Sequence, residues 1–370
     1  MDRGYTKTDS TNNAKDAKGI SSSAGTTTVR IQAIEDLGMG RKVGLSINTD
    51  WAEAGGLTQD AATTANSNAG NAGGNIPTAG GAFANAQSFL FIEDAKLGKV
   101  QLGNVNNEIL NTLTGVGAAF STGVGSAYSS SWSVLNGYGT GGTNRNNQVA
   151  ITAAGKTGAG VRGIRQVNTV KYVSPTIEGF TVAIGQALKN DTGAAAETST
   201  VGATDMSLTY VNGPLTAQHA SLKYKVGSDT TLNGGSLYGA TTTTALTANS
   251  TNTHTATAVS YAVMPTLKLS AAFGGSKASA DSIANSKFTQ YGVSYTMGQI
   301  DIMAQTAKVN DKNAVDFDRK MTGFGVNYNL SKTARAYVRY DKLNFDTQHA
   351  HTADSGQDIK RTAIGVSKSF

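Results

Sequence analysis

Two glycine-rich stretches of the chain have spacings that could cradle a phosphate group. Residues 150–157 (AITAAGKT) match a relaxed phosphate-loop pattern, and residues 158–163 (GAGVRG) match GxGxxG. Both patterns need a buried strand before them and a helix after them, because the helix aims its first backbone amides at the phosphate. The residues that follow have no helical period. We therefore interpret both matches as coincidences in a glycine-rich loop.

Side chains that could bind a metal or act as a nucleophile are few. The chain has no cysteine, which excludes thiolate metal sites and cysteine catalysis. His349 and His351 lie near Asp346, Asp354 and Asp358, but acids and histidines in exposed loops are usually solvated rather than metal-bound. Nothing resembles a GxSxG nucleophile elbow with His and Asp partners. The sequence predicts no enzymatic activity, no cofactor and no metal site.

The remaining candidate chemistry is electrostatic selection by basic side chains. Residues 105–168 contain one acid, Glu108, among several bases, and further bases alternate along strands that could line a channel, opposed by Asp50 and Asp341. Rings of basic side chains in a water-filled pore favour anions, and a focused potential raises the local anion concentration. The candidate constriction and lumen residues are Arg30, Lys42, Glu108, Arg145, Arg162, Arg165, Lys171, Arg335 and Arg339, with Lys156, Lys223 and Lys225 adding positive charge.

Strands must position these side chains, because apolar and polar residues alternate along many segments. In residues 26–35 (TTTVRIQAIE), Val29 and Ile31 fall on one face and Arg30 on the other. Segments 42–51, 221–226, 335–341 and 362–370 repeat the pattern. Side chains alternate across a strand, so each segment has one apolar and one polar face.

The connections between these segments alternate between short and long. Each short connection is rich in turn formers. Seven short turns and eight long loops predict sixteen strands of mostly 8–12 residues, close to the 9–11 residues that cross a bilayer at the usual tilt. The short turns are 36–40, 95–98, 175–179, 212–215, 264–266, 297–299 and 329–333; the long loops are 7–25, 52–84, 105–168, 190–203, 227–253, 276–286, 310–318 and 344–358.

Composition agrees with an all-β chain that has two kinds of surface. Charged residues are 15 %, below the roughly 25 % typical of soluble proteins, while 44 Gly and only 4 Pro fit many strands joined by polar loops. No run of 18 apolar residues could form a transmembrane helix. The net charge of +6 is scattered along the chain, which disfavours nucleic-acid binding. A soluble β-sandwich or β-helix remains the alternative, but no fixed repeat period is present.

Five segments, in order along the chain, resemble the Gram-negative trimeric general porins, the β-proteobacterial branch especially. They are EDLGMG at 35–40, LGKVQLG at 97–103, VKYVSP at 170–175 followed by Gly179 and Phe180, YNLSKT at 328–333 and GVSKSF at 365–370. The resemblance implies one all-β domain over 1–370, an antiparallel up-and-down transmembrane barrel of sixteen strands. It also implies that the long loop 105–168 folds into the lumen as a constriction, and that Phe370 ends an insertion signal.

The chain departs from the family pattern at two places. Family members open with a VTLYG-like strand before the acid that matches Asp2, so we expect the first strand to be truncated and the mature chain to carry about eight more residues. No signal peptide opens the chain, which indicates a cytoplasmic protein or a mature or trimmed form. The second departure concerns arginines. Asn104 stands where the family often has an arginine directly after the LGR-like strand, and Thr28 stands where the second strand has one, with Arg30 two residues later on the same face. The family's eyelet charges are therefore not carried over as a set.

The sequence predicts an outer-membrane channel of a Gram-negative bacterium for passive diffusion of small hydrophilic solutes and ions, with weak to moderate anion preference. The resemblance implies a homotrimer, with lipopolysaccharide and phospholipid of the outer membrane and small anionic or neutral solutes as partners. Two alternatives remain open: a substrate-specific channel with a saturable site, and a surface adhesin or structural β-protein without a pore. Planar-bilayer conductance distinguishes the channel from the adhesin.

Overall fold

The computed structural model describes twelve stretches of the chain, separated by gaps that lie mainly in the predicted long loops. The described residues are 1–10, 17–25, 27–50, 87–127, 152–153, 156–157, 165–188, 202–225, 251–278, 286–311, 319–345 and 358–370. Within them, no helix is long and apolar enough to cross a membrane.

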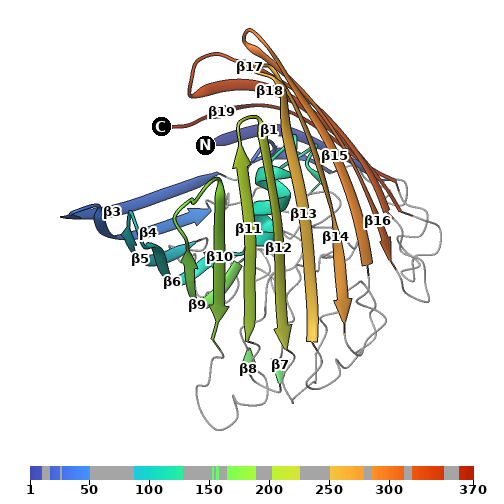
Figure 1. The fold of residues 1–370 in the computed structure, drawn as a ribbon. Coiled ribbons are helices and arrows are strands. Elements are labelled where there is room, and N and C mark those ends of the chain that lie inside the picture. Colours follow the sequence, from blue (N-terminus) through green and yellow to red (C-terminus); the bar gives the residue numbers. More distant parts are fainter. Residues whose placement is uncertain are drawn as a thin grey trace.

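A single large antiparallel sheet dominates the described structure, and it curves so that the two chain termini lie close together (Figure 1). Its strands are β1 (Asp2–Ser10), β2 (Ala17–Ser21), β3 (Thr28–Gly38), β4 (Arg41–Asp50), β5 (Ser88–Asp94), β6 (Gly98–Asn106), β9 (Arg165–Val173), β10 (Phe180–Ala187), β11 (Ala203–Asn212), β12 (Leu215–Lys225), β13 (Thr251–Met264), β14 (Leu267–Ala278), β15 (Ser286–Met297), β16 (Ile300–Asp311), β17 (Arg319–Asn329), β18 (Ala334–Phe345) and β19 (Asp358–Lys368). A separate two-stranded hairpin pairs β7 (Thr152–Ala153) with β8 (Lys156–Thr157).

Apart from β2 and β3, consecutive strands of the large sheet pair with each other, which is the up-and-down order that the turns predict. The first and last strands also pair, with Asp2 opposite Ser367 and Ser10 opposite Ile359. All seven predicted short turns join paired strands. Because side-chain alternation and turn chemistry are local properties, the sequence alone could predict this order.

The predicted count of sixteen strands is wrong by one, because the described sheet has 17. The additional strand is β2, which lies inside the predicted loop 7–25 and pairs with β1, Gly4 opposite Ser21. No register pairs β2 with β3 in the described residues, so the sheet is open between them. The two strands follow each other in the chain and run in the same direction. The prediction placed a single long loop at 7–25 and missed β2 within it.

Turn glycines fix the short connections. Gly98 begins β6 with φ +96°, a conformation that side chains other than glycine rarely adopt. A Cβ atom at Gly98 would also lie 2.3 Å from the carbonyl oxygen of Val173 on the neighbouring strand β9. The AKLG turn therefore requires glycine for both its backbone and its packing.

The two faces of the sheet differ in polarity as the alternation predicts. On β18, Arg339 and Asp341 face inward and are 4 % and 1 % exposed, whereas Val338 faces outward and is 49 % exposed. On β19, Ala363 faces inward, while Ile364 and Val366 face outward. A sheet with a polar inner face and an apolar outer face is suited to lipid outside and water inside.

The prediction was wrong on β12, where Lys223 was assigned to the lumen. Leu222 faces inward and is 1 % exposed, while Lys223 lies on the outer face and is exposed. In the segment SLKYK, the alternation alone does not say whether Leu222 or Lys223 faces the lumen. A long lysine side chain can also be accommodated on the outer face, because its ammonium group can reach polar surroundings. Only the register with β11, which places Leu222 opposite the inward Asp205, decides the face.

Candidate pore constriction

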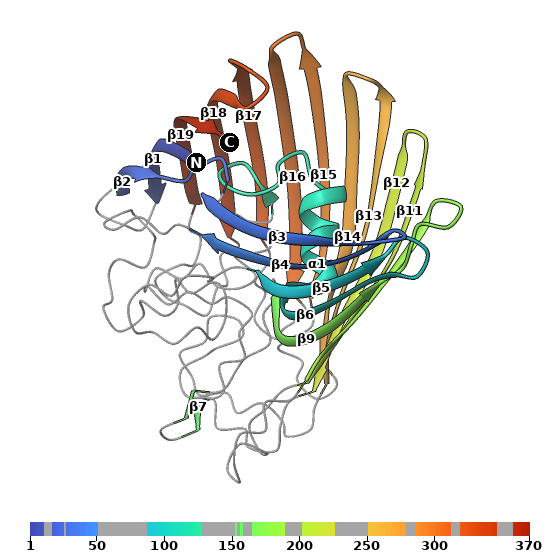
Figure 2. The ribbon, with the colours of Figure 1, turned by 90° about the vertical axis from the view of Figure 1, so that its left-hand side faces the viewer.

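Residues 107–127, here called the inner segment, lie on the concave side of the sheet (Figure 2). The inner segment begins with α1 (Glu108–Asn111) and continues into the π-helix η1 (Thr112–Val116). Asn107 caps the helix, its Oδ1 accepting from the Leu110 amide at 2.9 Å. This is the longest described part of the predicted loop 105–168, whose two ends belong instead to β6 and β9. Its position agrees with the prediction that the loop folds into the lumen.

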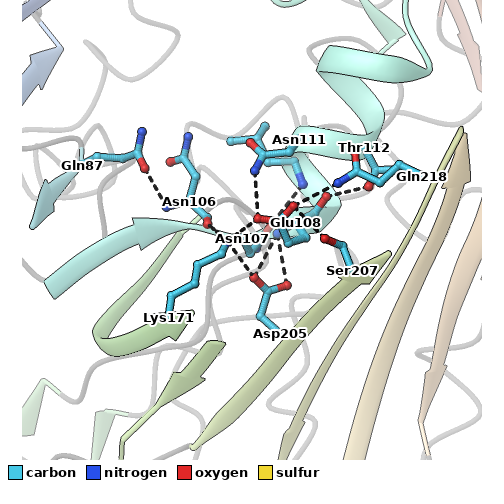
Figure 3. A network of polar contacts seen from close by, with 11 residues as sticks. Gln87, Asn106, Asn107, Glu108, Asn111, Thr112, Lys171, Asp205, Ser207 and Gln218 are labelled. Carbon is cyan, nitrogen blue, oxygen red and sulfur yellow. Dashed lines mark hydrogen bonds and ion pairs between the residues drawn. The ribbon is translucent and has the colours of Figure 1, made fainter. Parts of the chain in front are cut away.

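A buried ionic cluster holds the start of the inner segment to β9 and β11 (Figure 3). Lys171 contacts the Glu108 carboxylate and donates to Asp205 Oδ2 at 3.3 Å. The Glu108 backbone amide donates to both Asp205 oxygens at 3.1 and 3.0 Å. Glu108 also accepts from Ser207 Oγ at 3.1 Å and from Gln218 Nε2 at 3.0 Å. The single acid of the predicted constriction loop is therefore buried and paired with Lys171, which it shares with Asp205.

Two glutamines on the inner face hold the middle of the inner segment. Gln290 on β15 donates from Nε2 to the carbonyl oxygens of Leu113 at 3.3 Å and Gly117 at 2.6 Å. Gln305 on β16 accepts from the Phe120 amide through Oε1 at 3.2 Å. A neutral amide side chain satisfies backbone groups that would otherwise be buried without partners.

The end of the inner segment is held by Asp341 on β18 and by Ser23, which follows β2. Asp341 accepts from the Gly125 amide at 2.8 Å and is paired with Arg361, whose Nη2 lies 2.6 Å from Asp341 Oδ2. The Val124 amide donates to the Ser23 carbonyl oxygen at 2.7 Å, and the amide of the next residue, Ala24, donates to Asp2 on β1 at 2.7 Å. The inner segment therefore spans the concave face from β9 and β11 to β18 and the residues after β2.

Arg339 is covered by the inner segment. Its guanidinium carbon lies 4.8 Å from the centre of the Phe120 ring and 5.9 Å from that of Tyr337. Its Nη2 donates to Asn327 Oδ1 at 2.9 Å. A cation over an aromatic face is attracted by the ring quadrupole, so Arg339 attaches Phe120 to the wall.

Small residues on the wall create the room that the inner segment occupies. Ala220, Ala256, Ala258 and Ala272 are at most 1 % exposed. A Cβ atom at Gly323 would lie 2.2 Å from the Gly125 carbonyl oxygen. Because protein interiors are close-packed, a larger side chain at these places would displace the inner segment.

The structure separates the predicted site residues into three groups. Glu108, Lys171 and Arg339 meet beneath the inner segment, as described above. Arg30, Lys42 and Arg335 lie on the inner face away from it, with Arg30 Nε donating to Ser46 Oγ at 3.2 Å and Arg335 Nε donating to Ser367 Oγ at 3.2 Å. Arg145 and Arg162 lie outside the described residues, and only the backbone of Arg165, opposite Asn106, is described.

Acids and bases are nearly balanced on the described inner face. Among strand residues whose side chains are described, the register assigns to this face the bases Arg30, Lys42, Lys99, Lys171, Lys268, Arg335, Arg339 and Arg361 and the acids Asp2, Asp36, Glu93, Asp205, Asp301 and Asp341; Glu108 of the inner segment is a further acid. Any charge preference must therefore come from how these charges are exposed and from the bases of the loop.

Sequence reasoning missed several residues that hold the inner segment, among them Asp205, Gln290, Gln305 and Arg361. Their residue types do not mark them as contacts of the inner segment, because polar residues are expected over the whole inner face. The inward alanines and glycines of β12–β17 were the available signal, because small side chains on a polar lumen face indicate that something packs there.

Comparisons with known proteins agree with this architecture. The family model described as Gram-negative porin matches residues 1–348. An anion-selective porin from Comamonas acidovorans is 20 % identical, with TM-score 0.68 over 100 % of this chain and 97 % of that one. OmpT of Vibrio cholerae is 13 % identical, with TM-score 0.61 over 100 % and 97 %, and Salmonella typhi OmpF is 11 % identical, with TM-score 0.61 over 100 % and 96 %. A search of curated protein sequences gives no match.

Proposed function

The chain belongs to the Gram-negative porin family, and from this premise we propose how its channel selects solutes. The protein is a multi-pass β-barrel of the outer membrane, through which small hydrophilic solutes and ions diffuse passively. We propose a weak to moderate preference for anions. We also propose that the channel is a homotrimer, that lipopolysaccharide and phospholipid surround it, and that it has no catalytic activity.

One observation carries the anion preference: the only acid of the loop 105–168 is buried and ion-paired with Lys171 rather than exposed in the lumen. Glu108 is 7 % exposed and contacts Lys171, which is 3 % exposed. The loop bases Arg145, Lys156, Arg162 and Arg165 therefore have no acid of the same loop to offset them. The structurally similar Comamonas porin, which is described as anion-selective, supports the same direction.

We assign the eyelet to bases that are not used to hold the inner segment. These are Arg30, Lys42 and Arg335 on the wall, together with Arg145 and Arg162 in the loop and Arg165 at the start of β9. Glu108, Lys171 and Arg339 fix the constriction in place instead. Phe370 is fully exposed at the chain end, as an insertion signal requires for recognition.

The reversal potential of single channels in a salt gradient tests this assignment. We expect the wild-type channel to pass chloride more readily than potassium. The double variant Arg162→Gln/Arg165→Gln should shift the reversal potential toward cation preference, because it removes two loop bases without touching the cluster at Glu108. Lys96→Gln/Lys332→Gln, which changes two lysines in short turns, serves as the control and should leave the reversal potential unchanged. A wild-type channel that prefers cations would contradict the proposal.

A further inference from the structure

One large apolar side chain, Ile34, is exposed on the otherwise polar inner face of β3. Arg30 donates to the buried, inward Ser46 of β4, so alternation along the strand also turns Gln32, Ile34 and Asp36 inward. Ile34 is 54 % exposed. An exposed aliphatic side chain in a water-filled channel is a place where the apolar part of a solute can leave water.

Exposed apolar side chains are rare on this face. Among the large apolar side chains that the register turns inward in the described strands, Ile34 and Val211 alone are exposed, and Val211 is 47 % exposed at the turn end of β11. Others, such as Leu222 and Met321, are buried at 1 % and 0 % exposure. Ile34 therefore differs from the inward apolar residues against which the chain itself packs.

The wall next to Ile34 is apolar as well. Gly44 is directly opposite Ile34 on β4, and Phe91 is directly opposite Gly44 on β5. A Cβ atom at Gly44 would lie 2.5 Å from Cζ of the Phe91 ring, so the ring lies over the glycine. Phe91 is buried in a cluster with Phe89 and Val105. Ile34 is thus the exposed margin of an apolar region of the inner face.

Arg30 supplies a positive charge close to Ile34. Its Nε donates to Ser46 Oγ at 3.2 Å, and Ser46 is opposite Gln32, so the guanidinium group leans toward the level of Gln32, about 7 Å along the strand from Ile34. The register places Asp50 one diagonal step from Arg30, on the side away from Ser46. No described acid forms an ion pair with Arg30. Its other N–H groups are therefore suited to a carboxylate.

The inner face on the other side of Ile34 carries charges that offset one another. Lys42 is directly opposite Asp36 on β3 and directly opposite Glu93 on β5. Glu93 in turn pairs with Lys99 at 3.7 Å. Two acids and two bases thus alternate at this level, two residues from Ile34 toward the short turns. This level offers no net positive charge to a second carboxylate.

We propose that Arg30 and Ile34 form a solute site for monocarboxylates that carry an apolar chain. The guanidinium group binds the carboxylate, and the chain lies on Ile34. The inference rests on the proposed function and adds the class of solute to it. Chloride and acetate use the base alone, and a dicarboxylate of the same length places its second charge where the wall is electrically balanced.

Block of the single-channel chloride current by added carboxylates tests the site in the full chain. We expect the half-blocking concentration of hexanoate to be about tenfold lower than that of acetate, because contact with Ile34 removes part of the chain from water. Adipate, which has the same chain length and a second carboxylate, should block more weakly than hexanoate. Equal half-blocking concentrations for hexanoate and acetate would overturn the proposal, as would stronger block by adipate.

Three single variants locate the two parts of the site. Ile34→Ser should raise the half-blocking concentration of hexanoate about fivefold and leave that of acetate unchanged. Arg30→Gln should weaken the block by both anions. Val211→Ser removes the other exposed inward aliphatic side chain and serves as the matched control, which should behave as the wild type does. An equal loss of hexanoate block in Ile34→Ser and Val211→Ser would refute the contact with Ile34.

A probe of opposite charge separates the site from a general affinity for apolar chains. Hexylammonium carries the same chain as hexanoate and should not block; equal block by both would overturn the role of Arg30. All three variants should fold, since the substituted side chains are exposed, and the gel mobility of the folded barrel checks this. A chloride-preferring channel that does not distinguish hexanoate from acetate refutes only this site. A protein without conductance, or with cation preference, refutes the proposed function.

Discussion

Lys171 shows how a charge on the inner face can be removed from the lumen by its neighbours. Its side chain is 3 % exposed and is shared by the carboxylates of Glu108 and Asp205. A buried ion pair contributes little relative to a well-packed apolar replacement, but removing one partner is costly because the other charge is left buried and unpaired. Lys171 therefore holds the inner segment in position. Its loss should change the position of the constriction more than the charge selectivity of the channel.

We expect Lys171→Met to destabilise the attachment of the inner segment by about 3–5 kcal/mol, because two carboxylates lose their counter-ion. The inner segment should then leave the wall. Single-channel current noise should rise, and proteinase K should cleave between Asn107 and Ala127, where the wild type resists.

Two variants control this experiment. Lys42→Met removes an exposed base from the same face and should leave the noise and the cleavage unchanged. The triple variant Glu108→Gln/Lys171→Met/Asp205→Asn leaves no bare charge and should recover part of the protection. Wild-type noise and protease resistance in Lys171→Met alone would show that the cluster does not hold the segment.

At the level of elements, the inner segment and the wall fit each other through small residues. The π-helix η1 ends at Val116, and the following Gly117 donates its amide to the Thr112 carbonyl oxygen at 2.9 Å. A Cβ atom at Gly117 would lie 2.7 Å from the Cβ atom of Ala272 on β14. By contrast, a Cβ atom at Gly115 would have no neighbour within 4 Å.

These two glycines give a matched pair of substitutions. Gly117→Ala should lower the free energy of unfolding by about 1–3 kcal/mol, since it forces overpacking between η1 and the wall. Gly115→Ala should be neutral or slightly stabilising, because alanine restricts the unfolded chain more than glycine does. The free energies of unfolding of both variants can be measured by urea unfolding in detergent, with the gel mobility of the folded barrel as the readout. If Gly117→Ala is as stable as Gly115→Ala, the close packing of η1 against the wall is contradicted.

On the scale of the whole molecule, the barrel presents different environments on its two faces and at its two ends. The inner face is polar and partly occupied by the inner segment, while the outer face carries an apolar band. The strands are the common framework, because alternate side chains of the same strand serve both environments. A charge placed outward should therefore be tolerated or not according to its depth along the strand.

Strand β11 provides a test of this depth dependence on one face. Leu208→Lys places a charge in the middle of the outward face and should cost about 2–4 kcal/mol in a bilayer, whereas Asn212→Lys at the turn end should cost about 0–1 kcal/mol. Unfolding in lipid vesicles compares the two variants with the wild type. Equal costs at both positions would indicate that Leu208 does not face lipid.

The sequence by itself determined the fold class, the order of the strands, the seven turns and the family. These features are local: alternation has a period of two residues, and each turn is specified by a few adjacent side chains. The tertiary structure alone decided which charges remain exposed in the lumen. Glu108 meets Lys171 and Asp205 across 63 and 97 residues of chain, and the inward orientation of Leu222 on β12 depends on its register with β11. These contacts depend on how strands that are distant in sequence align with each other, and no single segment of the sequence specifies that alignment.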